Sequence, residues 1–130
     1  MQISNMTIKQ YNGQDANFYI QWKGEHSGRP LRKAIPNCFA IFTEISNAYD
    51  IAYAAFISKS YYRHIKGTCV PYIRIADAKE VLSLFISKNT EQKTANLKKI
   101  EQIDLAINKA EEQLKLLKQM KVAIACNYAK

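Results

Sequence analysis

The C-terminal third of the chain restricts the possible folds most strongly, because its composition differs from everything before it. All four glycines and all three prolines lie at or before residue 71. From about Thr90 onward the sequence consists mainly of Lys, Glu, Gln, Leu, Ile and Ala. These residues lose little conformational freedom in a helix. We therefore expect one long helix from Thr90 to about Cys126, on the order of 55 Å long at 1.5 Å per residue.

Apolar residues recur along this segment at alternating intervals of three and four, the spacing that keeps a helix face against one partner. The predicted seam is Ile100, Ile103, Ile107, Ala110, Leu114 and Leu117, continued by Ile124, with Leu97 and Met120 on its flanks. Lys93 and Lys121 fall on the same stripe and weaken its ends. We expect residues 97–124 to contact a second helix, in a homodimer or in another protein. The alternative is a helix folded back on its own domain.

Before this helix the sequence predicts a small mixed α/β globular domain, so the expected class is α+β with a long amphipathic, coiled-coil-like helix at the end. Strands are expected at residues 17–23, 38–43 and 69–75, because these runs are rich in aromatic and β-branched residues. Helices are expected from a cap at Ser46 or Asn47 through Phe56, and from a cap at Asp77 through Phe85. Residues 24–30 read as irregular. The predicted domains are 1–88 and 89–130.

The bulk composition narrows the classes of partner and the compartment. The formal net charge is +8, which favours a polyanion such as nucleic acid, although a solvated basic surface would give the same value. We find no apolar run of membrane-spanning length and no secretory signal pattern, so we expect no membrane partner. Three widely spaced cysteines form neither a disulfide framework nor a metal motif. We expect a cytoplasmic protein without a metal or other cofactor.

No catalytic constellation stands out in the sequence. His26 and His64 are the two histidines, and neither has a carboxylate or cysteine at motif spacing. A phosphate-binding loop of the Gly-Lys-Ser/Thr type is absent from the sequence, and the carboxylates are scattered rather than paired. We therefore expect a non-enzymatic protein.

Two basic clusters are the candidate nucleic-acid-binding sites. In the first, glycines let the backbone approach phosphate oxygens closely. In the second, aromatic and basic side chains alternate, as contact with both phosphates and bases requires. The candidate residues are Lys23, Arg29, Arg32 and Lys33 in the first cluster, and Lys59, Tyr62, Arg63 and Lys66 in the second. The alternatives are a solvated loop for the first and a helix end with core tyrosines for the second.

The stretch from Tyr62 to Asp77, YRHIKGTCVPYIRIAD, resembles the end of a target-recognition domain in the DNA-specificity subunits of type I restriction–modification systems. Glu91-Gln92 stands where those subunits enter a long helix, and Leu97, Ile100, Ile103, Ile107, Leu114 and Leu117 are similar to its pattern. The resemblance covers roughly residues 47–122, which corresponds to one half of such a bacterial subunit. It implies that Arg29, Arg32, Lys33, Arg63 and Lys66 face duplex DNA. It also implies that the helices pair as a spacer, antiparallel in that family.

Two functions follow as hypotheses. The first is a DNA-binding protein resembling a miniature half specificity subunit that dimerises through its C-terminal helix. The second is a protein–protein interaction module that docks by this helix and binds no nucleic acid.

Overall fold

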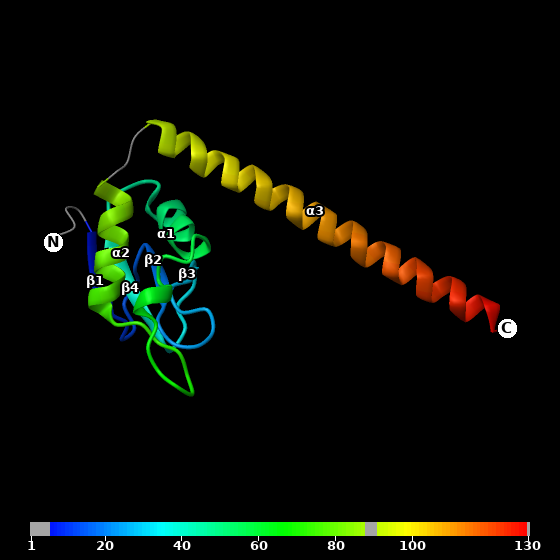
Figure 1. The fold of residues 1–130 in the computed structure, drawn as a ribbon, viewed down its shortest axis with the longest axis horizontal. Helices are drawn as coiled ribbons and strands as arrows, with labels where there is room; N and C mark the ends of the chain where they lie inside the picture. The colour runs from blue at the N-terminus through cyan, green and yellow to red at the C-terminus, as the bar shows by residue number, and fades with distance from the viewer. Residues whose placement is uncertain (1–5, 88–90, 130) are drawn as a thin grey trace. The chain divides into compact units, whose positions relative to one another are not determined.

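The computed structural model describes residues 6–87 and 91–129 (Figure 1). The chain divides into two compact units, residues 1–90 and 91–130. The first is a small α+β domain and the second is one long helix, which confirms the predicted fold class. The expected domain boundary after residue 88 lies outside the described residues. No described helix is long and apolar enough to cross a membrane.

The domain is built on a four-stranded antiparallel sheet. Its strands are β1 (Met6–Gln10), β2 (Phe18–Gln21), β3 (Pro30–Leu31) and β4 (Cys38–Thr43), in the order β1-β4-β2-β3. The strands expected at 17–23 and 38–43 correspond to β2 and β4. The sequence analysis missed β1, which has only two buried residues, and β3, which is two residues long. Pro30 therefore lies in a strand, although the segment ending there was predicted to be irregular.

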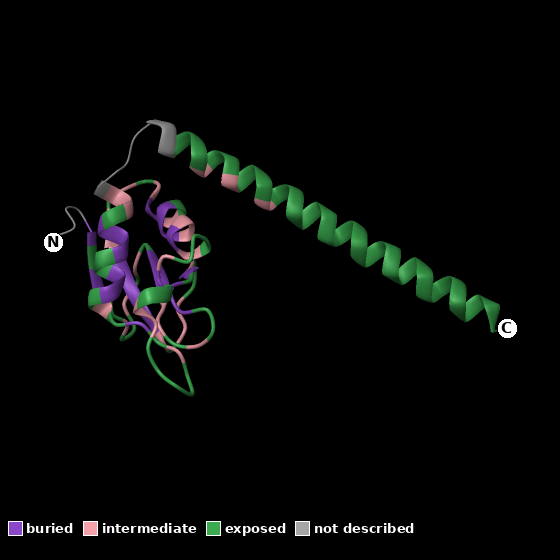
Figure 2. Cartoon of the chain, in the orientation of Figure 1, coloured by how far each residue is buried: buried purple, intermediate pink, exposed green. Residues whose placement is uncertain are grey.

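The hydrophobic core lies between one face of this sheet and two helices, α1 (Ala48–Ile57) and α2 (Ile75–Ser87) (Figure 2). Phe18 and Ile41 are paired across β2 and β4 and project into this core. Ala48, Ala52 and Ala55 are buried on α1, and their small side chains let the helix approach the sheet closely. On the other face, Tyr19, Cys38 and Ala40 form a smaller cluster that packs with Leu31 of β3 and with Ile35.

The helix expected after Ser46 or Asn47 is α1, and Asn47 is its N-cap residue. The expected capping by its side chain is wrong, because the Asn47 side chain makes no cap hydrogen bond in the described part of the chain. Its backbone carbonyl accepts from the Ile51 N–H, as the first bond of the helix requires.

The third predicted strand, at residues 69–75, is wrong. Only Tyr72 is paired there, in isolated bridges, and Ile75 already begins α2. Pro71 has no N–H to donate to a ladder, which limits pairing at its position.

The predicted N-cap at Asp77 is also misplaced. Asp77 is the third residue of α2, and its carboxylate accepts a hydrogen bond from the Arg74 N–H at 2.9 Å. This is the reach-back half of a capping box.

The second unit is α3 (Glu91–Tyr128), a helix of 38 residues. It corresponds to the predicted long helix and extends two residues beyond its expected end. At 1.5 Å per residue it is about 57 Å long.

Candidate nucleic-acid interface

Tyr72 joins the two basic clusters that the sequence analysis treated as separate. It forms an antiparallel bridge with Lys23 on one side and with Lys66 on the other. The Lys66 and Tyr72 backbones exchange two hydrogen bonds, of 2.8 and 2.9 Å. Side chains of directly paired residues project to the same face. The result is a row of Lys23, Tyr72 and Lys66, with both lysines exposed and Tyr72 37% exposed.

Backbone contacts on either side of this row hold the two segments in place. The Gly24 N–H donates to the Pro71 carbonyl at 2.8 Å, and the Ile73 N–H donates to the Trp22 carbonyl at 2.9 Å. These two bonds flank the isolated bridge between Lys23 and Tyr72 and hold residues 22–24 beside residues 71–73. Ser27 is buried, and its hydroxyl donates to the Gly24 carbonyl at 2.7 Å. The loop is thus anchored from within, and its basic side chains remain outside.

The second cluster begins at the C-terminal end of α1. Lys59 has a φ of 62°, the left-handed conformation that usually favours glycine. The Ser60 N–H donates to the Ala55 carbonyl and the Lys59 N–H donates to the Phe56 carbonyl. Together these bonds form a Schellman motif with lysine in the glycine position. The Lys59 Nζ lies 5.5 Å from the centroid of the Tyr62 ring, which is 64% exposed.

Arg32 makes a contact of its own, away from the bridges of Tyr72. The Arg32 guanidinium lies over the ring of Tyr49, 3.6 Å from its centroid, in a depression that Phe18 and Glu44 also line. This is a cation–π contact at the start of α1. Arg29, Arg32, Lys33 and Arg63 are all exposed.

Asp77 is the main buried charge beneath this surface. Its Oδ1 lies 3.5 Å from His64 Nδ1, and its Oδ2 lies 3.4 Å from Arg74 Nε. Burial alone would raise the pKa of Asp77. The hydrogen bonds from Arg74 and the charges of Arg74 and His64 lower this pKa by more than burial raises it, so the pKa lies below its ordinary value. The carboxylate therefore stays ionised and anchors His64 and Arg74.

The sequence analysis left Tyr72 out of the candidate interface. Tyr72 was assigned to a strand and left out of both clusters. Its position between Lys66 and Arg74 in sequence was the available signal, since it continues the alternation of basic and aromatic residues. Its pairing with Lys23, 49 positions away, had no local signal.

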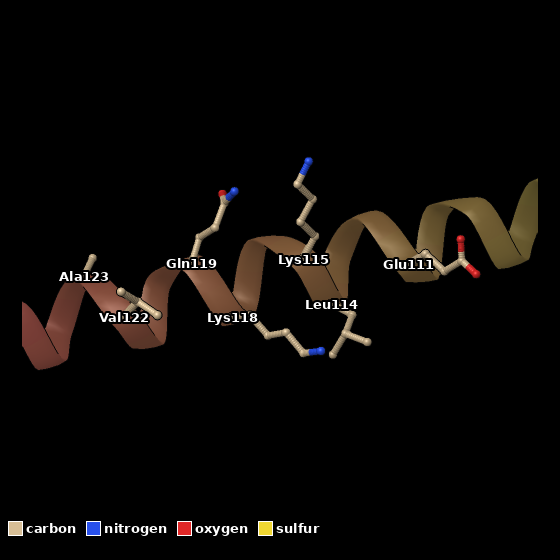
Figure 3. A pocket seen from close by; sticks show the side chains of 7 residues that line it. All are labelled: Glu111, Leu114, Lys115, Lys118, Gln119, Val122 and Ala123. Atoms are coloured by element: carbon tan, nitrogen blue, oxygen red, sulfur yellow. The ribbon is translucent and has the colours of Figure 1, made fainter.

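The predicted helix seam is exposed along most of its length. Ile103, Ile107, Ala110, Leu114, Leu117 and Ile124 are exposed, whereas Ile100 is half-buried. Figure 3 shows the side chains that line a shallow pocket on α3, where Leu114 and Lys118 project from the same side of the helix. Leu105, Leu116 and Val122 are also exposed but lie off the stripe. The apolar surface is therefore broader than the heptad seam alone.

The chain belongs to a family of proteins of unknown function, DUF6943, which matches residues 7–127. The match runs from β1 into the last turns of α3, so it includes both the domain and the helix. No curated protein and no solved structure matches the chain.

Proposed function

We propose that the protein is a non-enzymatic DNA-binding protein that dimerises through α3. The observation that carries the proposal is the row of Lys23, Tyr72 and Lys66, which brings one lysine of each predicted basic cluster beside the same tyrosine. The resemblance of residues 47–122 to DNA-specificity subunits supports the same function. The three cysteines are free, which is in keeping with the cytoplasmic location that we propose.

The chemistry of the surface suits a nucleic-acid backbone. Lysine ammonium groups neutralise phosphates and release condensed counterions, which supplies most of the sequence-independent affinity. The backbone N–H groups of Gly24 and Gly28 donate to carbonyls within the domain, so we assign the phosphate contacts to the basic side chains of the loop. Contacts of this kind position a protein on a duplex. Tyr62 and Tyr72 add hydroxyl donors between the lysines.

Fluorescence anisotropy with labelled duplex DNA tests the proposal. We expect binding that weakens steeply with salt. The slope of the logarithm of the binding constant against the logarithm of the salt concentration should fall in magnitude by about one for each phosphate-contacting lysine removed. The variant Lys23→Ala/Lys66→Ala should weaken binding and reduce the slope by about two. The control Lys9→Ala/Lys79→Ala loses the same charge from two other exposed positions and should change binding less. Absence of duplex binding at low salt would refute the proposal.

A second candidate function is a protein–protein interaction module, favoured by the exposed apolar residues of α3. An amphipathic helix that lays its apolar face into a groove or against another helix is a common mode of recognition. Under this alternative, DNA binding is weak and insensitive to Arg29→Ala and Arg63→Ala. A pull-down with the full chain would then return one specific protein that Leu114→Asp releases.

A further inference from the structure

Two tyrosines are exposed among residues 6–87, the described part of the domain, and both stand beside lysines. Tyr62 is 64% exposed and Tyr72 is 37% exposed. The Lys59 Nζ lies over the ring of Tyr62, 5.5 Å from its centroid. Tyr72 is paired with Lys23 on one side and with Lys66 on the other. Exposed rings and cations therefore alternate here, and we call these five residues the tyrosine–lysine surface.

The ring of Tyr72 is held in place by a glycine. Gly67 has a φ of 99°, and a Cβ added there would lie 3.2 Å from Tyr72 Cδ1, so the ring lies alongside the Gly67 backbone. The backbone hydrogen bonds between Tyr72 and Lys66 fix the segment from which the ring projects. A ring that is positioned before binding loses little conformational entropy when a ligand covers it. Tyr72 is thus suited to contact a flat ligand.

The two rings are close enough to belong to one site. Four residues lead from Tyr62 to Lys66, and they span at most about 14 Å. The Lys66 and Tyr72 backbones exchange two hydrogen bonds, and the Cα atoms of such a pair are about 5.5 Å apart. The Cα atoms of Tyr62 and Tyr72 therefore lie within about 20 Å of each other. A site of about 4 to 16 nucleotides, the size found in OB folds that bind single strands, covers this distance.

We infer that the tyrosine–lysine surface binds single-stranded nucleic acid, with unpaired bases stacked on the two rings and phosphates held by the lysines. This activity goes beyond the duplex binding proposed above, and it uses a different part of the tyrosines. In a duplex each base is covered on both faces by its neighbours, so a protein reaches base edges and phosphates. An unpaired base presents its flat face, and an aromatic ring stacks on that face whatever the base.

The charges around the rings suit the backbone of such a strand. Lys23, Lys59 and Lys66 are all exposed, and their ammonium groups neutralise phosphates next to the stacked bases. The carboxylate of Asp77 lies beneath this surface, is 4% exposed and is paired with His64. It is therefore screened from an approaching strand.

Fluorescence anisotropy with the full chain and labelled oligothymidylate tests the inference, because thymine bases stack weakly on one another and leave their faces free. Tyr62→Ala and Tyr72→Ala should each weaken binding by about tenfold. Tyr62→Phe and Tyr72→Phe keep the ring and should bind as the wild type does. None of these changes removes a charge, so the salt dependence should stay the same. The control Tyr128→Ala removes a tyrosine that is 92% exposed on α3 and should leave binding unchanged.

An oligomer of the same length built from abasic sites separates stacking from phosphate contacts. It keeps every phosphate and lacks the bases, so the wild type should bind it at least about tenfold more weakly than oligothymidylate. On this abasic probe Tyr62→Ala should cause no further loss. Equal losses for Tyr62→Ala on the two probes would overturn the stacking of bases on its ring. Tyr62 is the decisive position, because it lies outside the hydrophobic core and its truncation leaves the packing of the domain intact.

The outcomes separate this inference from the proposed function. Oligouridylate is measured beside oligothymidylate, and ring-dependent binding of either strand supports the inference, with the stronger binder naming RNA or DNA. A chain that binds duplex DNA but neither single strand overturns the inference and leaves the proposed function standing. A chain that binds a single strand but no duplex does the reverse. Binding to none of these probes at low salt refutes both.

Discussion

Gly28 lies directly against the ring of Tyr61. A Cβ added at Gly28 would come within 2.5 Å of Tyr61 Cδ2 and 2.8 Å of Cγ, closer than packed atoms approach. Tyr61 is 2% exposed and packs in the core, so its ring has little space to move away. Gly28 also has a φ of 98° and donates from its N–H to the Gln21 carbonyl at 2.7 Å. The first basic loop is therefore fixed to the second basic segment by this contact.

We predict that Gly28→Ala destabilises the domain by about 3 kcal/mol, from the clash with the ring and from the unfavourable backbone conformation. Gly13→Ala is the matched control, because Gly13 has a similar φ of 105° but open space where its Cβ would be. It should cost only the backbone term, about 1 kcal/mol. Urea denaturation monitored by tryptophan fluorescence measures the loss in unfolding free energy for both variants. Equal losses would show that the Tyr61 contact contributes nothing.

The environment of the Tyr61 hydroxyl predicts that Tyr61→Phe does not destabilise the domain. It is buried and has no hydrogen-bond partner among the described residues, and burial raises its pKa above the ordinary value. Tyr61→Phe removes an unsatisfied polar group, so stability should stay unchanged or rise by up to about 1 kcal/mol. In Tyr19→Phe the lost hydroxyl accepts from the Ala16 N–H and donates to the Gln14 carbonyl. That variant should lose about 1 kcal/mol in the same denaturation measurement.

These contacts show which features were predictable from the sequence. The α3 helix was predictable because its hydrogen bonds are local and its composition favours helix over the whole length. The strands β2 and β4 were visible as apolar runs, since most of their residues are buried. The contacts of Gly28 with Tyr61 and of Lys23 with Tyr72 join segments far apart in the chain, and no local pattern encodes them. The false strand at residues 69–75 has the same origin, because its apolar residues serve a bridge and the start of a helix.

The lowered pKa of Asp77 predicts that its contribution to stability depends on pH. Since the pKa is lower in the folded than in the unfolded chain, the ionised carboxylate stabilises the fold above the unfolded pKa. That contribution is lost as the pH falls through the folded pKa. Asp77→Asn should therefore cost about 1 to 2 kcal/mol at neutral pH and progressively less in acid. The exposed Asp15→Asn serves as control. A constant difference between wild type and Asp77→Asn from neutral to acidic pH would contradict the assignment.

The exposed seam of α3 predicts that single charges abolish self-association. Ile107→Asp or Leu114→Asp places a carboxylate in the apolar contact, where it has no partner and loses its hydration. Light scattering should then report the monomer mass. Leu105→Asp introduces the same charge at a position that is 57% exposed but off the stripe. This variant should still show the mass of a dimer. Loss of the dimer in all three variants would show that the contact does not follow the stripe.

Lys59 predicts opposite effects on stability and on binding. Its left-handed φ of 62° costs about 1 kcal/mol for a residue with a Cβ, and glycine at this position of the Schellman motif removes the cost. Lys59→Gly should therefore raise the melting temperature. If the proposed interface is correct, the same change weakens duplex binding, because it removes a cation beside Tyr62. Lys59→Asn, which tolerates the left-handed conformation but carries no charge, should also weaken binding. A glycine variant that is more stable and binds DNA as well as the wild type would exclude Lys59 from the interface.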